Sequence, residues 1–262
     1  MLMMKSNLPA LFVVALLLAS PVFAQQGKPK TEPKPKTDLQ EKSGAKPKAP
    51  APVMYDAGQK TKEAPFEDVE VFDEEAYKPK PIDTTQGLAV IAFGSCNKVD
   101  KPQLWADVNA NNPNLWVWLG DIIYADTSNM KALAAHYKRL KTNPEYKKLR
   151  TKAQVIGVYD DHDYGINDGC KDYPFKKGAK KCLMDFLDVP MNSPLRKREG
   201  AYSSYTFGSG NQRIKVIVMD TRYFRDPLEP DPTKQRRYIP NTTGDMLGEA
   251  QWKWLEKEHR TS

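Results

Sequence analysis

The chain has 262 residues, enough for one large domain or two small ones, and a formal net charge of +7. Its basic residues are not interleaved with aromatic residues, and no known nucleic-acid-binding motif occurs. The positive charge therefore does not indicate a nucleic-acid-binding protein.

Residues 1–24 have the three parts of a signal peptide. Lys5 gives a positive start, residues 8–21 form an apolar run, and the sequence VFA precedes Gln25 as a small-residue cleavage site. The run is short for a membrane span and no basic cluster follows it directly, which disfavours the alternative of an uncleaved anchor. The sequence predicts a periplasmic or secreted protein, exported by a Sec-type route, with no transmembrane span after cleavage.

Residues 25–85 are predicted to link the signal peptide to the folded part. Residues 25–52 are rich in lysine and proline and nearly free of large apolar residues, so they cannot bury enough surface to offset the entropy of ordering. We interpret them as a disordered tether, which could also attract an anionic envelope polymer. The acidic segment of residues 66–81 continues this linker.

From residue 86 to residue 262 the sequence predicts an α/β domain. Three continuous apolar runs are typical of strands buried on both faces. They occupy residues 88–96, 114–124 and 153–161. The segments between them have the apolar spacing of helices. These segments cover residues 101–113, 129–140 and 143–150. Strands that alternate with helices are typical of a parallel sheet with right-handed crossovers.

The later part of the chain has a different pattern. Residues 180–190 predict a short helix, and residues 246–259 predict a final amphipathic helix. Between them, residues 201–208 alternate and residues 210–222 are apolar, which predicts a hairpin. The spacing of Cys170 and Cys182 would permit a short disulfide loop, but spacing alone does not establish one.

Polar side chains follow all three runs of the predicted parallel sheet. They are Cys96, Asp121, Tyr124, Asp160, Asp161 and His162. Because ligands bind beyond the carboxyl ends of such strands, these groups are expected to converge. A thiolate, a phenolate, carboxylates and an imidazole in one small volume suit metal ions, whose charge offsets the repulsion.

Each of these residues also has a simpler explanation. Cys96 could be a small buried apolar residue, Asp121 a turn residue and Tyr124 a packing aromatic. Two neighbouring carboxylates could share a proton as an acid and base pair. A cysteine hydrolase based on Cys96 is disfavoured, since nearby carboxylates would raise the pKa of the thiol.

Five ordered motifs closely resemble those of the alkaline phosphatase D (PhoD-like) family of metallophosphatases. The motifs are FGSC, GDIIY, YDDHD, VMDTRYFR and LGEAQWKWL. Tyr159 and Asp163 stand where the family has Trp and Glu. The resemblance implies a metallophosphatase-like α/β/β/α sandwich. It also implies a metal-dependent phosphoric ester hydrolase, a phosphodiesterase or alkaline phosphatase, that uses a metal-bound hydroxide.

The resemblance further implies a site with Fe³⁺ and Ca²⁺, or another divalent metal pair. The implied metal ligands are Cys96, Asp121, Tyr124, Asp161 and Asn167. His162 and Arg222 would act on the phosphoester, while Asp160 and Asp163 would support the ligands. For Arg222 the alternative is a structural ion pair with Asp220 or Asp226.

The family continues beyond the LGEAQWKWL helix with further strands and a histidine-bearing segment. The chain is therefore expected to lack the C-terminal part of the domain. This leaves a second hypothesis open, in which the chain is a non-catalytic remnant that binds an envelope polymer or a partner.

Overall fold

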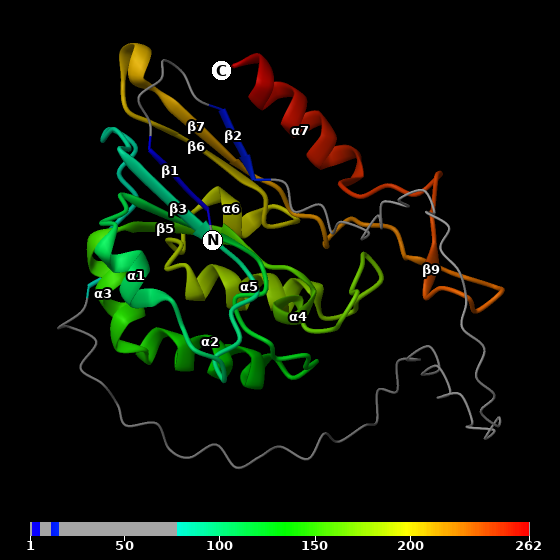
Figure 1. Cartoon of the computed structure of the whole chain (residues 1–262). Coiled ribbons are helices and arrows are strands. Elements are labelled where there is room, and N and C mark those ends of the chain that lie inside the picture. Colours follow the sequence, from blue (N-terminus) through cyan, green and yellow to red (C-terminus); the bar gives the residue numbers. More distant parts are fainter. Residues whose placement is uncertain (1, 6–11, 16–77, 262) are drawn as a thin grey trace, which may run out of the picture. The chain divides into compact units, whose positions relative to one another are not determined.

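Three parallel strands form most of the first sheet (Figure 1). They are β3 (Val90–Gly94), β4 (Leu115–Leu119) and β5 (Gln154–Val158), in that order. Neighbouring strands are paired in register, with Ile91 opposite Leu115 and Trp116 opposite Val155. The three predicted strands are therefore confirmed as direct neighbours, so their carboxyl ends share one edge.

The helices between these strands also follow the prediction. They are α1 (Trp105–Ala110), α2 (Met130–Thr142) and α3 (Pro144–Lys152). Asn129 and Asn143 begin α2 and α3 by accepting hydrogen bonds from backbone N–H groups of the first turn, which would otherwise lack partners. Pro144 opens α3, where a missing N–H costs nothing. The predicted helix before the hairpin is α5 (Lys176–Phe186), followed by the short α6 (Pro194–Lys197).

The second sheet contains the predicted hairpin. Strands β6 (Ser203–Phe207) and β7 (Ile214–Val218) are antiparallel, with the 3₁₀ turn Gly210–Gln212 between them. Two short strands, β8 (Glu229–Pro230) and β9 (Tyr238–Ile239), pair separately. The final helix α7 (Gly248–Arg260) packs Trp254 and Leu255 against a small cluster formed by Ile217, Met219 and Leu247.

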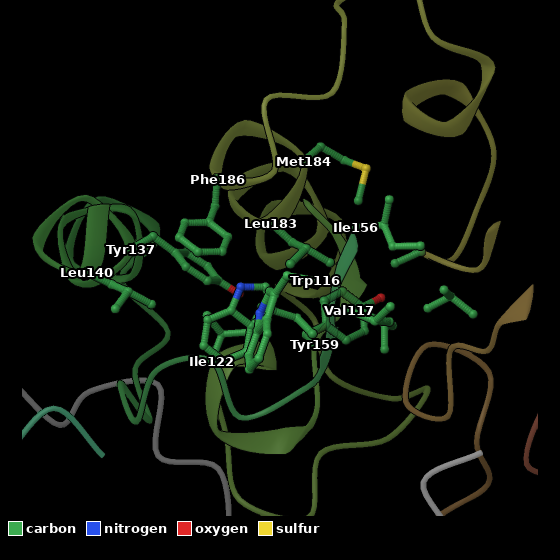
Figure 2. Packing of buried hydrophobic residues seen from close by; sticks show 14 of the residues in the cluster. Trp116, Val117, Ile122, Tyr137, Leu140, Ile156, Tyr159, Leu183, Met184 and Phe186 are labelled. Atoms are coloured by element: carbon green, nitrogen blue, oxygen red, sulfur yellow. The ribbon is translucent and has the colours of Figure 1, made fainter. Parts of the chain in front are cut away.

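An aromatic core joins the first sheet to its helices. The Trp105 ring lies 5.3 Å from Trp116 and 5.4 Å from Trp118, in edge-to-face contacts. The buried Trp118 indole donates to the Tyr146 hydroxyl at 3.0 Å. Figure 2 shows Phe186 of α5 beside Tyr137 of α2, with ring centroids 4.7 Å apart. This packing fixes the sheet whose edge carries the polar motifs.

This computed structural model describes residues 2–5, 12–15 and 78–261. The predicted cleavage site and the tether lie outside the described residues. Within the predicted signal peptide, β1 (Leu2–Lys5) pairs antiparallel with β3, and β2 (Phe12–Ala15) pairs parallel with β7. No helix in the described part is long and apolar enough to cross a membrane.

The cysteines in the described part are not bridged. Cys96, Cys170 and Cys182 are all free thiols, and the buried Cys182 thiol donates to the Met130 carbonyl at 3.5 Å. The structure therefore contains no disulfide between Cys170 and Cys182.

Candidate metal centre

The loops after β3, β4 and β5 bring the predicted ligands to one edge of the sheet. The loop after β4 approaches the loop after β5 very closely at Gly120. A side chain there would place its Cβ 2.5 Å from the backbone nitrogen of Asp160, and the φ of Gly120 is +91°. Only glycine fits both conditions without strain. Gly120 therefore lets Asp121 come close to the acids that follow β5.

Asp121 lies at the centre of the cluster and is only 7% exposed. Its Oδ2 accepts a hydrogen bond from the Tyr124 hydroxyl at 2.9 Å and a weaker one from the Cys96 thiol at 3.6 Å. Its Oδ1 is buried and has no partner among the described residues. Burial raises the pKa of the Asp121 carboxyl. The hydrogen bond from Tyr124 acts to lower this pKa, but the negative charges of Asp160 and Asp161 raise it further, so the net shift is upward.

Asp161 and His162 complete a possible ligand set with Asp121. Each of the three offers one ligand atom, and these atoms all lie within 4.8 Å of one another. Asp161 and His162 lie in a single helical turn after β5, α4 (Asp161–Tyr164). The predicted strand of residues 153–161 was therefore too long, because β5 ends at Val158. Burial acts to raise the pKa of Asp161, but Arg222 and the backbone N–H of Asp168 outweigh it, so the net shift is downward.

His162 is held from the side by Asp126. Its Nδ1 lies 2.8 Å from both carboxylate oxygens of Asp126, and its ring centroid lies 4.2 Å from that of Tyr124. The backbone N–H of Asp126 also donates to the His162 carbonyl at 3.3 Å. The sequence analysis did not select Asp126, although it lies two residues after Tyr124.

Asp163 lies beneath the cluster and is fully buried. It accepts backbone N–H hydrogen bonds from Asp160 at 2.7 Å, Asp121 at 3.2 Å and Ile122 at 3.0 Å. The Tyr137 hydroxyl also donates to it, at 3.3 Å. Asp163 thus ties the loop after β4 to the loop after β5.

Arg222 is 5% exposed and faces the acids after β5. Its Nε donates to Asp160, and a terminal nitrogen lies 3.8 Å from Asp161. Burial acts to lower the pKa of the guanidinium, but the acids outweigh it and the net shift is upward. The structural ion pair considered for Arg222 therefore exists, with Asp160 as its partner in place of Asp220 or Asp226.

Asn167 is exposed and lies beside the cluster. Its side-chain amide donates to the carboxylate of Asp168 at 2.8 Å. The backbone N–H of Asp168 in turn donates to Asp161 at 2.7 Å. The structure thus connects Asn167 to the site through its neighbour.

A family model for PhoD-like phosphatase matches residues 91–262, well over half of the chain. The chain belongs to the PhoD-like phosphatase family. This match includes all the residues that converge at the sheet edge, and it confirms the family that the motifs resemble.

A solved structure supports the fold of this PhoD-like chain. The structure titled "Structure of PhoD" superposes with a TM-score of 0.51 at 18% sequence identity. The match covers 68% of this chain and 40% of that chain, so the present chain spans less than half of its length. At this identity the likeness shows a metallophosphatase-like α/β fold, as expected. None of the curated proteins matches the sequence significantly.

Backbone strain is concentrated at the sheet edge that carries the polar cluster. In the described part of the chain, seven non-glycine residues have a positive φ, and four of them surround the cluster. These four are Cys96, Asp121, Asp126 and Asp168. Such conformations cost on the order of 1–3 kcal/mol each and persist where the surroundings enforce them, often at functional sites. The strain favours a function for this edge.

Asp220 is a second supporting acid that the sequence analysis named only as a partner for Arg222. It is fully buried, and its Oδ1 accepts the backbone N–H groups of Arg222 and Tyr223, both at 2.9 Å. Its Oδ2 accepts the Tyr159 hydroxyl and the Ala201 N–H, both at 2.7 Å. Tyr159, which replaces the family tryptophan, therefore still donates a hydrogen bond here.

Proposed function

We propose that this chain is a metal-dependent phosphoric ester hydrolase. The observation that carries the proposal is Asp121 Oδ1, a buried carboxylate oxygen that has no partner among the described residues and lies in a cluster with Asp161 and His162. Leaving such an atom unpaired is costly unless a cation meets it. The donor set fits a metal ion, and family membership supplies the phosphoester as substrate.

The chemistry of the donors indicates which ions they would hold. Cys96, Tyr124 and Asp121 combine a thiol, a phenol and a carboxylate, which suits iron as the family resemblance implies. Asp161 and Asn167 offer oxygen atoms, which suit Ca²⁺ or another hard divalent ion. Asp121, which lies between the two groups, would be shared by both ions.

A metal pair bound there would activate water and stabilise negative charge on the phosphoryl group. His162 would hold or supply a proton at the phosphoester, with its ring kept in place by Asp126 and Tyr124. Arg222 is buried and pairs with Asp160, which supports a role in holding the acids. Its second terminal nitrogen, Nη1, has no hydrogen-bond partner among the described residues, so it could still donate to a phosphate. Lys98, exposed and 4.7 Å above the Tyr124 ring, is a further cation near the site.

The decisive experiment is hydrolysis of bis-p-nitrophenyl phosphate and p-nitrophenyl phosphate by the purified chain, with iron and calcium added and then with a chelator. The variant is Asp121→Asn, and the matched control is Asp107→Asn, an exposed acid on α1. We expect turnover that the chelator abolishes, that Asp121→Asn lacks and that Asp107→Asn keeps. The ratio of the two rates measures the preference for diesters over monoesters.

Absence of turnover from a folded, metal-supplemented chain would contradict the proposal. That result would favour the non-catalytic remnant. Binding to an envelope polymer would then depend on residues 25–52, which lie outside the described residues.

Export is part of the proposal and rests on residues 1–24. Cleavage after residue 24 would remove β1 and β2 from the mature chain, because both strands lie before that point. The N-terminal residue of the purified protein, read by mass spectrometry from a periplasmic or culture fraction, tests this directly. A chain recovered intact from the cytoplasm would contradict it.

A further inference from the structure

A cavity of about 630 Å³ is lined by residues of both β5 and β6. These are the last strands of their sheets, so in the described part of the chain no strand pairs with their outer edges. Helices α5, α6 and α7 and residues 79–82 line the space instead. None of the candidate metal ligands lines this cavity, and its volume is in the range of small-molecule pockets. It is therefore a site separate from the metal centre.

Most of the cavity wall is apolar. Val155 and Ile156 contribute to it from β5, and Leu195 from α6. Phe186 and Val189 line it at the end of α5 and in the loop that follows. Such a wall favours a ligand with an apolar body, because contact with the wall removes apolar surface from water.

The two acids that line the cavity already have cationic partners. Asp188 pairs with Lys141 at 2.7 Å and also with Arg150. Glu258 pairs with Lys215 at 2.8 Å. Because each acid is neutralised by a neighbouring cation, the cavity does not present an excess of negative charge that would repel an anion.

Arg198 lines the same cavity and lacks such compensation. Its guanidinium lies over the Tyr202 ring, 4.0 Å from the centroid, and 5.4 Å from that of Trp254. Its Nε is buried and has no hydrogen-bond partner among the described residues. A stacked guanidinium presents its N–H donors along its own plane, where a carboxylate or phosphate can accept two of them.

The segment that carries Arg198 is held in place by other cations. The buried Lys180 of α5 donates to the carbonyl oxygen of Leu195 at 2.6 Å and to that of Arg198. Arg196 donates to Asp185 and to the Val189 carbonyl, both at 2.6 Å. Burial lowers the pKa of the Arg198 guanidinium, because the chain compensates its charge incompletely.

We propose that this cavity binds an anionic amphiphile, a small molecule in which a carboxylate or phosphate is joined to an apolar body. The anionic group pairs with Arg198, and the apolar body lies against Val155, Phe186 and Leu195. The site does not require a metal ion, so it can be tested independently of the proposed hydrolase activity.

The first test is calorimetric titration of the purified full chain, with a chelator present so that no metal centre binds or hydrolyses the probe. The probes are octanoate, octyl phosphate, octanol and inorganic phosphate. We expect the two charged amphiphiles to bind, octanol to bind at least about 10-fold more weakly, and inorganic phosphate not to bind measurably. The tighter of the two amphiphiles identifies the preferred head group. Equal binding of octanol, measurable binding of inorganic phosphate, or no binding of either amphiphile would contradict the proposal.

A matched pair of variants tests the role of the guanidinium. Arg198→Met keeps an unbranched stem and removes the charge, so it should bind octanoate about 10–100-fold more weakly. Lys197→Met removes a charge from the preceding residue, which is exposed on α6 and does not line the cavity, and should keep the wild-type affinity. Wild-type affinity in Arg198→Met would overturn the inference.

The second test locates the ligand without changing Arg198, and it therefore holds even if Arg198→Met does not fold. Trp254 lines the cavity, whereas Trp252 is 50% exposed and does not line it. Octanoate should change the intrinsic fluorescence of the wild type and of Trp252→Phe, and this change should be lost in Trp254→Phe. A change that persists in Trp254→Phe would place the ligand outside the cavity and show the inference to be wrong.

Discussion

Two pairs of aspartates near the same edge of the sheet occupy different environments. Asp121 and Asp161 lie at the open edge of the sheet, and Asp121 keeps one buried oxygen without a partner among the described residues. Asp163 and Asp220 lie beneath them, fully buried, and both oxygens of each accept hydrogen bonds. The same side chain is thus left unsatisfied in one place and fully satisfied in the other.

The difference separates acids that can bind a ligand from acids that hold the binding loops. A carboxylate whose lone pairs are all used has nothing left to offer a metal ion, whereas one with a free buried oxygen gains most when a cation arrives. Asp163 and Asp220 fix the backbone on both sides of the site, at Asp121 and at Arg222. Their role is to hold the geometry in which Asp121 remains unsatisfied.

The largest effect is expected from the fully satisfied pair. Asp163→Asn places an amide NH₂ against backbone N–H groups, which leaves buried donors facing each other. Loss of two or more of these hydrogen bonds should lower the free energy of unfolding by about 3–5 kcal/mol. Urea denaturation of the metal-free variant beside Asp107→Asn measures this. A loss below about 1 kcal/mol, typical of a surface substitution, would show that the buried carboxylate is not needed for folding.

Asp220→Asn tests the second of the two fully hydrogen-bonded aspartates. Like Asp163, Asp220 accepts from three backbone N–H groups and one tyrosine hydroxyl. The Tyr159 hydroxyl lies 2.7 Å from Asp220, closer than the 3.3 Å between Tyr137 and Asp163, so it is better placed to rotate and accept from the new amide. The expected loss in the free energy of unfolding is therefore smaller, about 2–3 kcal/mol. The same denaturation series gives the value, and the double variant with Tyr159→Phe shows whether the hydroxyl provides the relief.

Most of the fold was predictable because its signals are local. Continuous apolar runs indicated β3, β4 and β5, and helical spacing of apolar residues indicated α2 and α3. The turn α4 was missed because only four residues form it and its sequence continues directly from a strand. Its formation depends on the Asp163 contacts to the preceding backbone, which no local pattern reveals.

The sequence predicted which residues gather at the site, but it did not predict the contacts that surround them. Three strand ends indicated Cys96, Asp121 and Asp161, because parallel strands bring their carboxyl ends together. The sequence could not show that Arg222 crosses from the second sheet to pair with Asp160. Nor could it show that Asp126 reaches His162, since 36 residues separate them. These contacts depend on tertiary packing.

Removal of the Asp121 charge should stabilise the metal-free chain, because one oxygen of this buried carboxylate has no partner among the described residues. The pKa of Asp121 is raised above the unfolded value, so the cost of ionising it is absent in acid and develops as the pH rises through the folded pKa. Asp121→Asn removes that cost, and at neutral pH the metal-free variant should unfold at a higher temperature than the wild type.

Both the pH and bound metal should change the difference in stability between the wild type and Asp121→Asn. Below about pH 3.8, where the carboxyl is protonated in both states, the difference between wild type and Asp121→Asn should vanish. With iron and calcium added it should reverse at neutral pH, because only the wild type gains the free energy of binding. Melting curves at three pH values, with and without metal, test the sign. A variant that is less stable without metal would show that Asp121 is a structural acid like Asp163.

The smallest effect on folding is expected from replacing the thiol of Cys96. Cys96 is exposed, and its one side-chain donation, to Asp121 at 3.6 Å, is weak. Cys96→Ser should therefore change the free energy of unfolding by less than about 0.5 kcal/mol. Iron content per chain, measured by mass spectrometry of the purified protein, should nevertheless fall clearly, because the hydroxyl is a poorer ligand than a thiolate. Unchanged iron with unchanged stability would remove Cys96 from the metal centre and leave Tyr124 and the carboxylates as its ligands.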